Sequence, residues 1–245
     1  MLSKNIRILS IVAFLLIWEV TAFFIASSTF PSISQIATSL YDHTFNSDLL
    51  YNLGVTLYRV FVCFFVVMFL GIIFGILMGI SKKIDDIFDF ILILGLNIPA
   101  LVTIVICYIW FGLTDFAALL AVILNKLPIV IVNVREGTKA IDRKYIQLAK
   151  VYKVSKKETF FKVFLPQIYP YIMASTRLCL SLIWKIVLVV ELLGRSDGIG
   201  FKISMFFQFF DITSILAYSF AFVLVILLIE KLFLKPIDLY INKWK

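Results

Sequence analysis

The sequence predicts an all-α, polytopic membrane protein with about six transmembrane helices. The chain has 245 residues, of which 62% are hydrophobic and only 16% are charged, whereas about 25% of the residues in soluble domains are charged. Its mean hydropathy is +1.04. A soluble protein of this size could not bury so much apolar surface, so we expect the apolar segments to lie in lipid.

Six apolar segments are long enough to cross a bilayer, for which a helix needs roughly 20 residues. They cover residues 9–26, 52–80, 86–110, 115–134, 167–193 and 212–234. The first follows Lys4 and Arg7 but is too long for the apolar core of a signal peptide, so we expect it to be retained. Pro99 and Pro128 lie inside the third and fourth segments, where a proline predicts either a simple kink or a functional hinge.

The basic residues predict the orientation of these helices. If the N-terminus is cytoplasmic, most lysines and arginines fall in cytoplasmic segments, above all in the loop 135–166. The outer segments contain only Arg195 and Lys202. Loops rich in Lys and Arg stay on the cytoplasmic side, so we expect both termini to be cytoplasmic. The net charge of +8 then follows from topology and requires no nucleic-acid partner.

Residues suited to catalysis or metal binding are scarce. His43 is the only histidine, and Cys63, Cys107 and Cys179 stand far apart in apolar segments, where they are expected to pack as small core residues. An intramembrane enzyme would need a nucleophile–base pair or metal ligands within its spans. The chain also contains no Walker A sequence. We therefore predict a non-catalytic chain without a metal site, in which residues 1–245 form one transmembrane domain.

The segment 147–166, QLAKVYKVSKKETFFKVFLP, interrupts the apolar sequence with a basic, helix-like pattern. On a helix, Tyr145, Leu148, Val151 and Tyr152 lie on one face, at i, i+3, i+6 and i+7. Such an amphipathic helix can lie on anionic lipid, cover its own bundle, or dock into a groove on a partner. The pattern alone does not distinguish these three uses.

Gly71, Gly75 and Gly79 form the pattern G-x-x-x-G-x-x-x-G in the second predicted span. Small residues at this spacing allow two helices to pack closely. The pattern does not show whether the second helix belongs to the same chain or to another copy.

Charged residues inside apolar spans cost at least ~2.5–3.5 kcal/mol near the bilayer centre, so they are expected to face protein or water. Lys126 lies in the fourth span, and Lys185 and Glu191 lie in the fifth, with Trp184 beside the lysine. In one interpretation, a lysine–glutamate pair holds two spans together. In the other, these residues line a path across the membrane, and the lysines provide a counter-charge for an anionic substrate.

The basic segment resembles the cytoplasmic signature of binding-protein-dependent ABC importer permeases, which reads E-A-A, three residues, G, nine residues, I-x-L-P. The positions that correspond to this signature are Gln147, Leu148, Ala149, Lys153, Val163, Leu165 and Pro166. Ala149, Leu165 and Pro166 match it outright. Lys153 stands where the signature has its glycine, and this difference leaves open whether the usual sharp turn forms.

Further segments resemble the same family in the same order along the chain. They cover residues 30–36, 52–81, 97–113, 127–142 and 165–200, and they are most similar to the branch that transports nitrate, sulfonates and taurine. The last of them places Glu191 at the family's A-E-M position. The resemblance implies the fold of a type I ABC importer permease, located in a bacterial inner membrane.

The resemblance also implies partners. Residues 147–153, with Val151 and Tyr152 on the apolar face and Leu165 and Pro166 after it, would form a coupling helix that docks on an ATPase subunit. A second permease copy, two subunits that bind ATP and Mg, an extracytoplasmic binding protein and membrane lipid would complete the importer, so the chain needs no cofactor of its own. An importer permease for a vitamin precursor of thiamine or riboflavin type is an alternative. A secondary transporter is less compatible, because no two related halves are visible.

Overall fold

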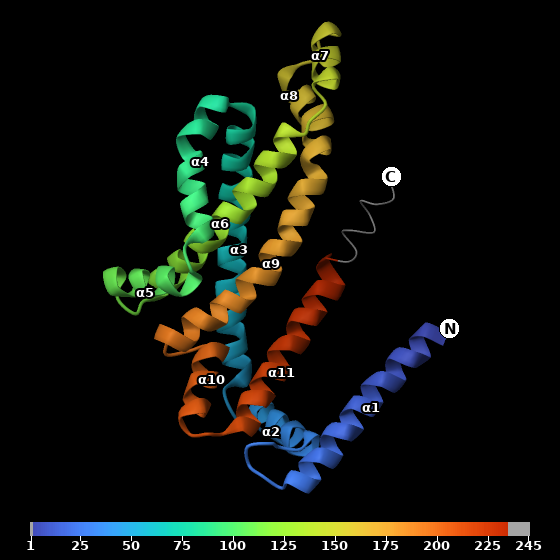
Figure 1. Cartoon of the computed structure of the whole chain (residues 1–245), viewed down its shortest axis with the longest axis vertical. Coiled ribbons are helices and arrows are strands. Elements are labelled where there is room, and N and C mark those ends of the chain that lie inside the picture. The colour runs from blue at the N-terminus through green and yellow to red at the C-terminus, as the bar shows by residue number, and fades with distance from the viewer. Residues whose placement is uncertain (1, 235–245) are drawn as a thin grey trace. The chain divides into compact units, whose positions relative to one another are not determined.

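The computed structural model describes the backbone of residues 2–234 and the side chains of Ile6 and residues 9–232. Every regular element within this range is a helix, which confirms the predicted all-α class. The elements are α1 (Leu2–Ile25), α2 (Ile33–Phe45), α3 (Leu49–Ile80), α4 (Lys82–Asn97), α5 (Ala100–Phe111), α6 (Asp115–Lys139), α7 (Arg143–Val151), α8 (Lys156–Thr159), η1 (Phe160–Phe164), α9 (Leu165–Gly194), α10 (Ile199–Gln208), α11 (Ile212–Ile229) and η2 (Glu230–Leu234), where η marks a π-helical turn (Figure 1).

Three helices of the described chain are long and apolar enough to cross a membrane, namely Leu49–Ile80, Asp115–Lys139 and Ile212–Leu232. The bent pair of α4 and α5 makes a fourth if both helices are counted as one span, and Leu9–Ile25 is a shorter apolar helix. These helices correspond to five of the predicted segments, but six full spans stay a prediction. The C-terminal lysines that contributed to the predicted orientation lie mostly outside the described residues, beyond position 234.

The chain divides into two compact units, which are described separately. The terminal unit comprises Met1–Thr56 and Glu191–Lys245, and the central unit comprises Leu57–Val190. Both α3 and α9 contribute residues to each unit. The prediction of one domain over residues 1–245 is not decided by this division.

In the central unit, α3 packs closely on α6 through the predicted glycine row. A methyl group added at Gly71 would lie 2.5 Å from a Val130 methyl, and one added at Gly79 would lie 2.3 Å from Thr138. Gly75 faces Val134 in the same way, at 2.7 Å. The helix that these glycines contact therefore belongs to the same chain, and any larger residue would force α3 and α6 apart.

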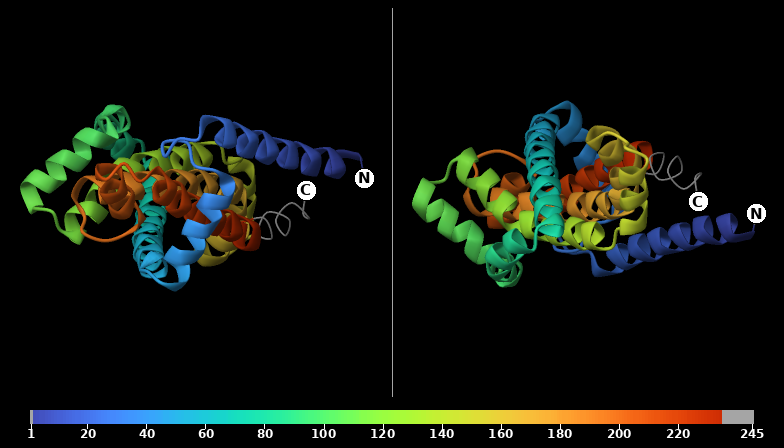
Figure 2. Two further views of the ribbon diagram at one scale, coloured as in Figure 1. Left: turned by 90° about the horizontal axis from the view of Figure 1, so that it is seen from below. Right: turned by 90° about the horizontal axis from the view of Figure 1, so that it is seen from above.

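The third predicted span breaks at its proline. Helices α4 and α5 meet at 99°, and Pro99 is the N-cap of α5 (Figures 1 and 2). Ile98 has the extended backbone (φ −72°, ψ 123°) that a following proline favours, and the Asn97 side chain donates to the carbonyl of Ile93 at 2.7 Å. Pro128, unlike Pro99, does not end a helix: α6 continues through it from Asp115 to Lys139.

In the terminal unit, Glu19 of α1 binds the start of α2. Its two carboxylate oxygens accept hydrogen bonds from the Ile33 N–H at 2.6 Å and from the Ser34 hydroxyl at 2.9 Å. Ser32 and Gln35 form a capping box at the same helix end, a pattern that favours helix initiation. The polar segment after the first span therefore contains a helix that the hydropathy pattern alone did not predict.

Candidate functional site

Helix α7 carries the apolar face that the residue spacing predicted, and this face is exposed. The exposed fractions are 53% for Leu148, 76% for Val151 and 75% for Tyr152, and Tyr145 is exposed as well. Ala149 is the one buried residue of α7, while Gln147 is open to solvent. No part of the central unit covers the face, and exposed apolar patches of this kind mark contacts with a partner or with lipid.

The sharp turn after α7 forms although a lysine occupies the glycine position. Lys153 has a φ of +52°, in the left-handed region. The N–H of Val154 donates to the carbonyl of Ala149 at 2.9 Å, and the N–H of Lys153 donates to that of Lys150 at 3.1 Å. These two bonds define a Schellman motif, in which glycine is the usual left-handed residue. A residue with a side chain adopts this conformation at a cost of roughly 1–2 kcal/mol.

The chain re-enters a helix at Ser155, whose hydroxyl accepts from the Glu158 N–H at 3.2 Å. Hydrogen bonds from Lys162 and Ser155 hold the pKa of Glu158 below its usual value. The π-helical turn follows, and the N–H of Leu165 donates five residues back to the carbonyl of Phe160. Pro166, which is exposed, has no N–H to donate, and the signature's Leu-Pro pair forms the start of α9.

The two ends of this loop are tied together. Gln167 near the start of α9 accepts a hydrogen bond from the N–H of Asp142, the N-cap of α7, at 3.0 Å. Gly137 near the end of α6 lies against the ring of Tyr171, where an added methyl would be 2.4 Å away. Because both contacts are short, α7 is held at the point where α6 and α9 meet.

A network of ion pairs that the sequence did not predict joins α4 to the end of α6. The Nη1 of Arg135 binds Asp85 at 3.0 Å and also binds Asp89, and its Nε binds Glu136 at 3.0 Å. Lys139 binds the other oxygen of Asp85 at 2.7 Å. The sequence does contain one signal for this network. Asp85 and Asp89 are four residues apart, and two aspartates at this spacing on one helix repel each other unless a cation lies between them. No group of His, Cys, Asp and Glu within the described residues is arranged to hold a metal ion.

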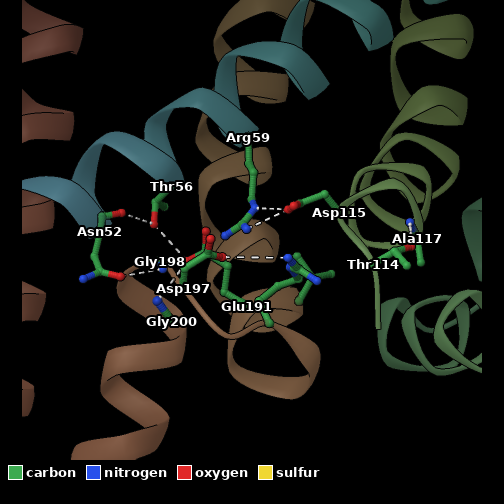
Figure 3. A network of polar contacts seen from close by, with 12 residues as sticks. Asn52, Thr56, Arg59, Thr114, Asp115, Ala117, Glu191, Asp197, Gly198 and Gly200 are labelled. Carbon is green, nitrogen blue, oxygen red and sulfur yellow. Dashed lines mark hydrogen bonds and ion pairs between the residues drawn. The ribbon is translucent and has the colours of Figure 1, made fainter. Parts of the chain in front are cut away.

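Arg59 is a second buried charge of the central unit. Its side chain is 2% exposed, and its Nε and Nη2 donate to Asp115, the first residue of α6, at 2.9 and 2.7 Å (Figure 3). Fixed in this way, the guanidinium is a positive charge inside an apolar span. Arg59 lies in the second predicted span, 52–80, and the sequence did not predict a partner for it.

Glu191 belongs to the terminal unit, where it is completely buried. Its Oε2 accepts from the Thr56 hydroxyl and from the Gly200 N–H, each at 2.9 Å (Figure 3). Asn52 accepts from the Gly198 N–H at 2.8 Å. Side chains of α3 and α9, those of Asn52, Thr56 and Glu191, thus cap the N-terminus of α10. Gly198, at φ +99°, allows the close approach of the Glu191 carboxylate.

The other predicted path residues lie in the central unit. Lys126 of α6 is half-buried, and no ion pair or hydrogen bond of its ammonium is found within residues 57–190. Lys185 of α9 is exposed, and its Nζ lies 5.5 Å from the centre of the Trp184 ring, within the range of a cation–π contact. Contact of Lys126, Trp184, Lys185 and Glu191 with a solute stays a prediction.

The chain is similar in sequence to known proteins. Residues 68–233 match the sequence family described as the binding-protein-dependent transport system inner membrane component. The chain is 30% identical to an aliphatic sulfonates transport permease of Escherichia coli K12, over 76% of this chain and 71% of that one. It is 26% identical to the Bacillus subtilis 168 protein of the same name, over 94% and 83%, and 25% identical to the taurine transport system permease of Escherichia coli K12, over 81% and 72%.

The family match covers more than half of the chain, and it includes α4 to α9 with the exposed helix α7. The recognition made from the signature and from the ordered segments is therefore confirmed, and with it the type I permease fold. The chain belongs to the binding-protein-dependent family of ABC importer permeases, in the branch that includes the nitrate, sulfonate and taurine permeases.

Proposed function

We propose that this permease forms the path for a small solute that carries an anionic group. The relatives named above transport aliphatic sulfonates and taurine, and others are named as nitrate and bicarbonate permeases. All four named solutes are small and bear a sulfonate, nitrate or carbonate group. That shared chemistry is the observation that carries the proposal.

The exposed face of α7 supports docking on an ATPase subunit. Leu148, Val151 and Tyr152 provide apolar contact area, and the exposed Lys150 and Lys153 add positive charge at its edge. An amphipathic helix with an uncovered apolar face is suited to a hydrophobic groove. When two ATPase subunits close on ATP, the movement of α7 shifts the permease between inward- and outward-open states.

We further propose that two permease copies assemble with two ATPase subunits and receive solute from an extracytoplasmic binding protein. The loop 135–166 and both termini are cytoplasmic in this arrangement, because of the positive charge of the loop. Single cysteines, introduced at Ser47 and at Ser155 in a chain without its native cysteines, test the orientation. A membrane-impermeant thiol reagent added from outside should label the first and spare the second, and the opposite result refutes the orientation.

Lys126 and Lys185 are suited to give the anion a transient counter-charge. Both lie on helices of the central unit, and neither ammonium is bound to a carboxylate of that unit in the structure. A charge next to a passing anion lowers the cost of leaving water. Replacement of Lys126 by Ala should reduce the affinity for the solute, while Lys126→Arg keeps part of it. Normal uptake by Lys126→Ala excludes this role for the residue.

The proposed solute class is tested with the complete native complex, isolated through a tag on this chain and reconstituted in vesicles. Uptake of labelled alkanesulfonate, taurine, nitrate and bicarbonate is compared with uptake of a thiamine precursor, with and without ATP. We expect ATP-dependent uptake of at least one anion and none of the precursor. Uptake of the precursor alone favours the vitamin alternative, and uptake that needs no ATP contradicts the importer mechanism.

A further inference from the structure

The ion-pair network on α6 lies directly before the coupling helix. Arg135 and Lys139 occupy the last turns of α6, and only residues 140–142 separate this helix from α7. Asp142, the last of the three, caps α7 and donates its own N–H to Gln167. Because this connection is short and fixed, a displacement of α7 would also move the end of α6.

The same network holds the first turns of α4. Asp85 and Asp89 are one turn apart on α4, and both bind Nη1 of Arg135. Farther along α4, contact with α6 is apolar: Leu92 packs with Ile131, and an added methyl at Gly95 would lie 2.8 Å from Pro128. The ionic contacts are thus the attachment of α4 nearest to the coupling helix.

Arg135 is the central member of the network. The side chains of Arg135 and Asp85 are only 13% and 15% exposed, so solvent screens their attraction less than that of a surface pair. Three carboxylates, those of Asp85, Asp89 and Glu136, converge on this one guanidinium. Without it, Lys139 alone would face them, and the two aspartates would repel each other across one helical turn.

The helix held in this way leads to the bend between α4 and α5. α4 ends at Asn97, and α5 continues at 99° to it after Pro99. The orientation of α5 therefore depends on where α4 lies. A clamp between α4 and the end of α6 makes the bent pair follow any movement of the segment that leads into α7.

We propose that Arg135 is a positioning residue for transport, which fastens α4 to the coupling segment so that the bent pair α4–α5 moves with α7. This proposal rests on the proposed docking of α7 on the ATPase. The guanidinium suits this task because its Nη1 and Nε serve different carboxylates at once, which a lysine ammonium cannot do in the same fixed geometry.

The test uses the complete native complex in vesicles and measures both solute uptake and ATP hydrolysis. Arg135→Gln should retain the ATPase subunit and hydrolyse ATP, but the number of solute molecules carried per ATP should fall about tenfold or more. The variant loses the contacts with Asp85, Asp89 and Glu136, and a single charge-assisted hydrogen bond already corresponds to about a factor of ten. Arg135→Lys should retain part of the coupling. Two matched controls should behave as wild type: Asp86→Asn, an exposed neighbour of Asp85, and Lys162→Gln, which removes the exposed pair with Glu158.

A triple variant separates the link from a simple loss of stability. Asp85→Asn, Asp89→Asn and Arg135→Gln together remove the repulsion as well as the clamp, so the complex should assemble and unfold near the wild-type temperature. We expect it still to carry few solute molecules per ATP. Wild-type stoichiometry in the triple variant, or in Arg135→Gln, overturns the proposal.

The docking of α7 is judged separately with Leu148→Asp in the same assay. If Leu148→Asp keeps both the ATPase subunit and normal uptake, the docking proposal fails, whatever Arg135 does. If Leu148→Asp releases the ATPase subunit while Arg135→Gln transports normally, only the role of Arg135 is refuted.

Discussion

Helices α7 and α10 have nearly the same length, 9 and 10 residues, yet their N-termini are satisfied in opposite ways. Helix α7 is capped by Asp142, the residue directly before it, whose carboxylate accepts from the Lys144 N–H at 2.9 Å. Helix α10 has Gly198 as its N-cap, and its first N–H groups donate to side chains from α3 and α9. The first turn of α7 is thus stabilised by a neighbouring residue in the sequence, whereas the first turn of α10 depends on side chains that are distant in the sequence.

The burial of the two helices follows the same division. On α7 only Ala149 is buried, and the side chains of Tyr145, Leu148 and Val151 are exposed. The first two residues of α10, Ile199 and Gly200, are buried. Their N–H groups donate to the Thr56 hydroxyl and to the Glu191 carboxylate, which are buried as well. The helix proposed to receive a partner thus leaves its apolar face uncovered and is hydrogen-bonded to α9 at its N-terminal end, whereas α10 is bound through buried polar contacts.

The largest effect is expected from removal of the tertiary cap of α10. Glu191→Ala leaves the Gly200 N–H and the Thr56 hydroxyl without this acceptor in a fully buried site, at a cost of roughly 3 kcal/mol. Thermal unfolding of the purified protein in detergent measures the loss. Glu191→Gln retains an oxygen acceptor and should lose clearly less. Equal unfolding temperatures for wild type and Glu191→Ala would show that α10 does not depend on this cap.

The next largest effect concerns the exposed face of α7. Leu148→Asp and Tyr152→Asp each place a charge in the proposed groove contact, which should weaken docking of the ATPase by about 2 kcal/mol. Stability of the isolated permease should not change, because both positions are exposed. Co-purification of the ATPase subunit gives the measurement, and Leu148→Met is the apolar control. Docking elsewhere in the loop, nearer Phe160, is indicated if both variants retain the ATPase and transport normally.

A smaller effect is expected from removal of the local cap of α7. Asp142→Ala should destabilise this helix by about 1 kcal/mol, and Asp142→Asn, which keeps the acceptor oxygen, should be nearly neutral. Hydrogen exchange of the α7 amides reports the change, while the amides of α10 should be unaffected. If α10 amides exchange faster as well, the two helices are not independent in the way the caps suggest.

The smallest effect is expected at the turn after α7. Lys153→Gly relieves the cost of the left-handed conformation but adds freedom to the unfolded chain, so the net gain should be about 0.5 kcal/mol or less. Slower exchange of the Val154 amide, which closes the Schellman motif, would show the gain. Lys150→Gly is the matched control: it lies inside the helix, where glycine should cost about 1 kcal/mol. A loss of protection in Lys153→Gly would mean that the lysine side chain stabilises the turn.

The sequence predicted the helical class, the break at Pro99 and the apolar face of α7, because each depends on residues close together in the chain. Spacing of apolar residues reports the faces of a helix whatever surrounds it. It did not predict α10, whose N-terminus has no local cap, and it missed α2, although Ser32 and Gln35 form a readable capping box. These segments are too polar or too short for hydropathy to distinguish a helix from a loop.

The sequence by itself determined what local chemistry can specify: the apolar helices, the proline break, the basic segment and the family signature with a lysine at its turn. Only the tertiary structure decided which charges meet. It placed Arg135 between Asp85 and Asp89 of another helix, and it used Glu191 as the cap of α10. The physical reason is that the partner of a buried charge is chosen by helix packing, which brings together residues that are far apart in the chain.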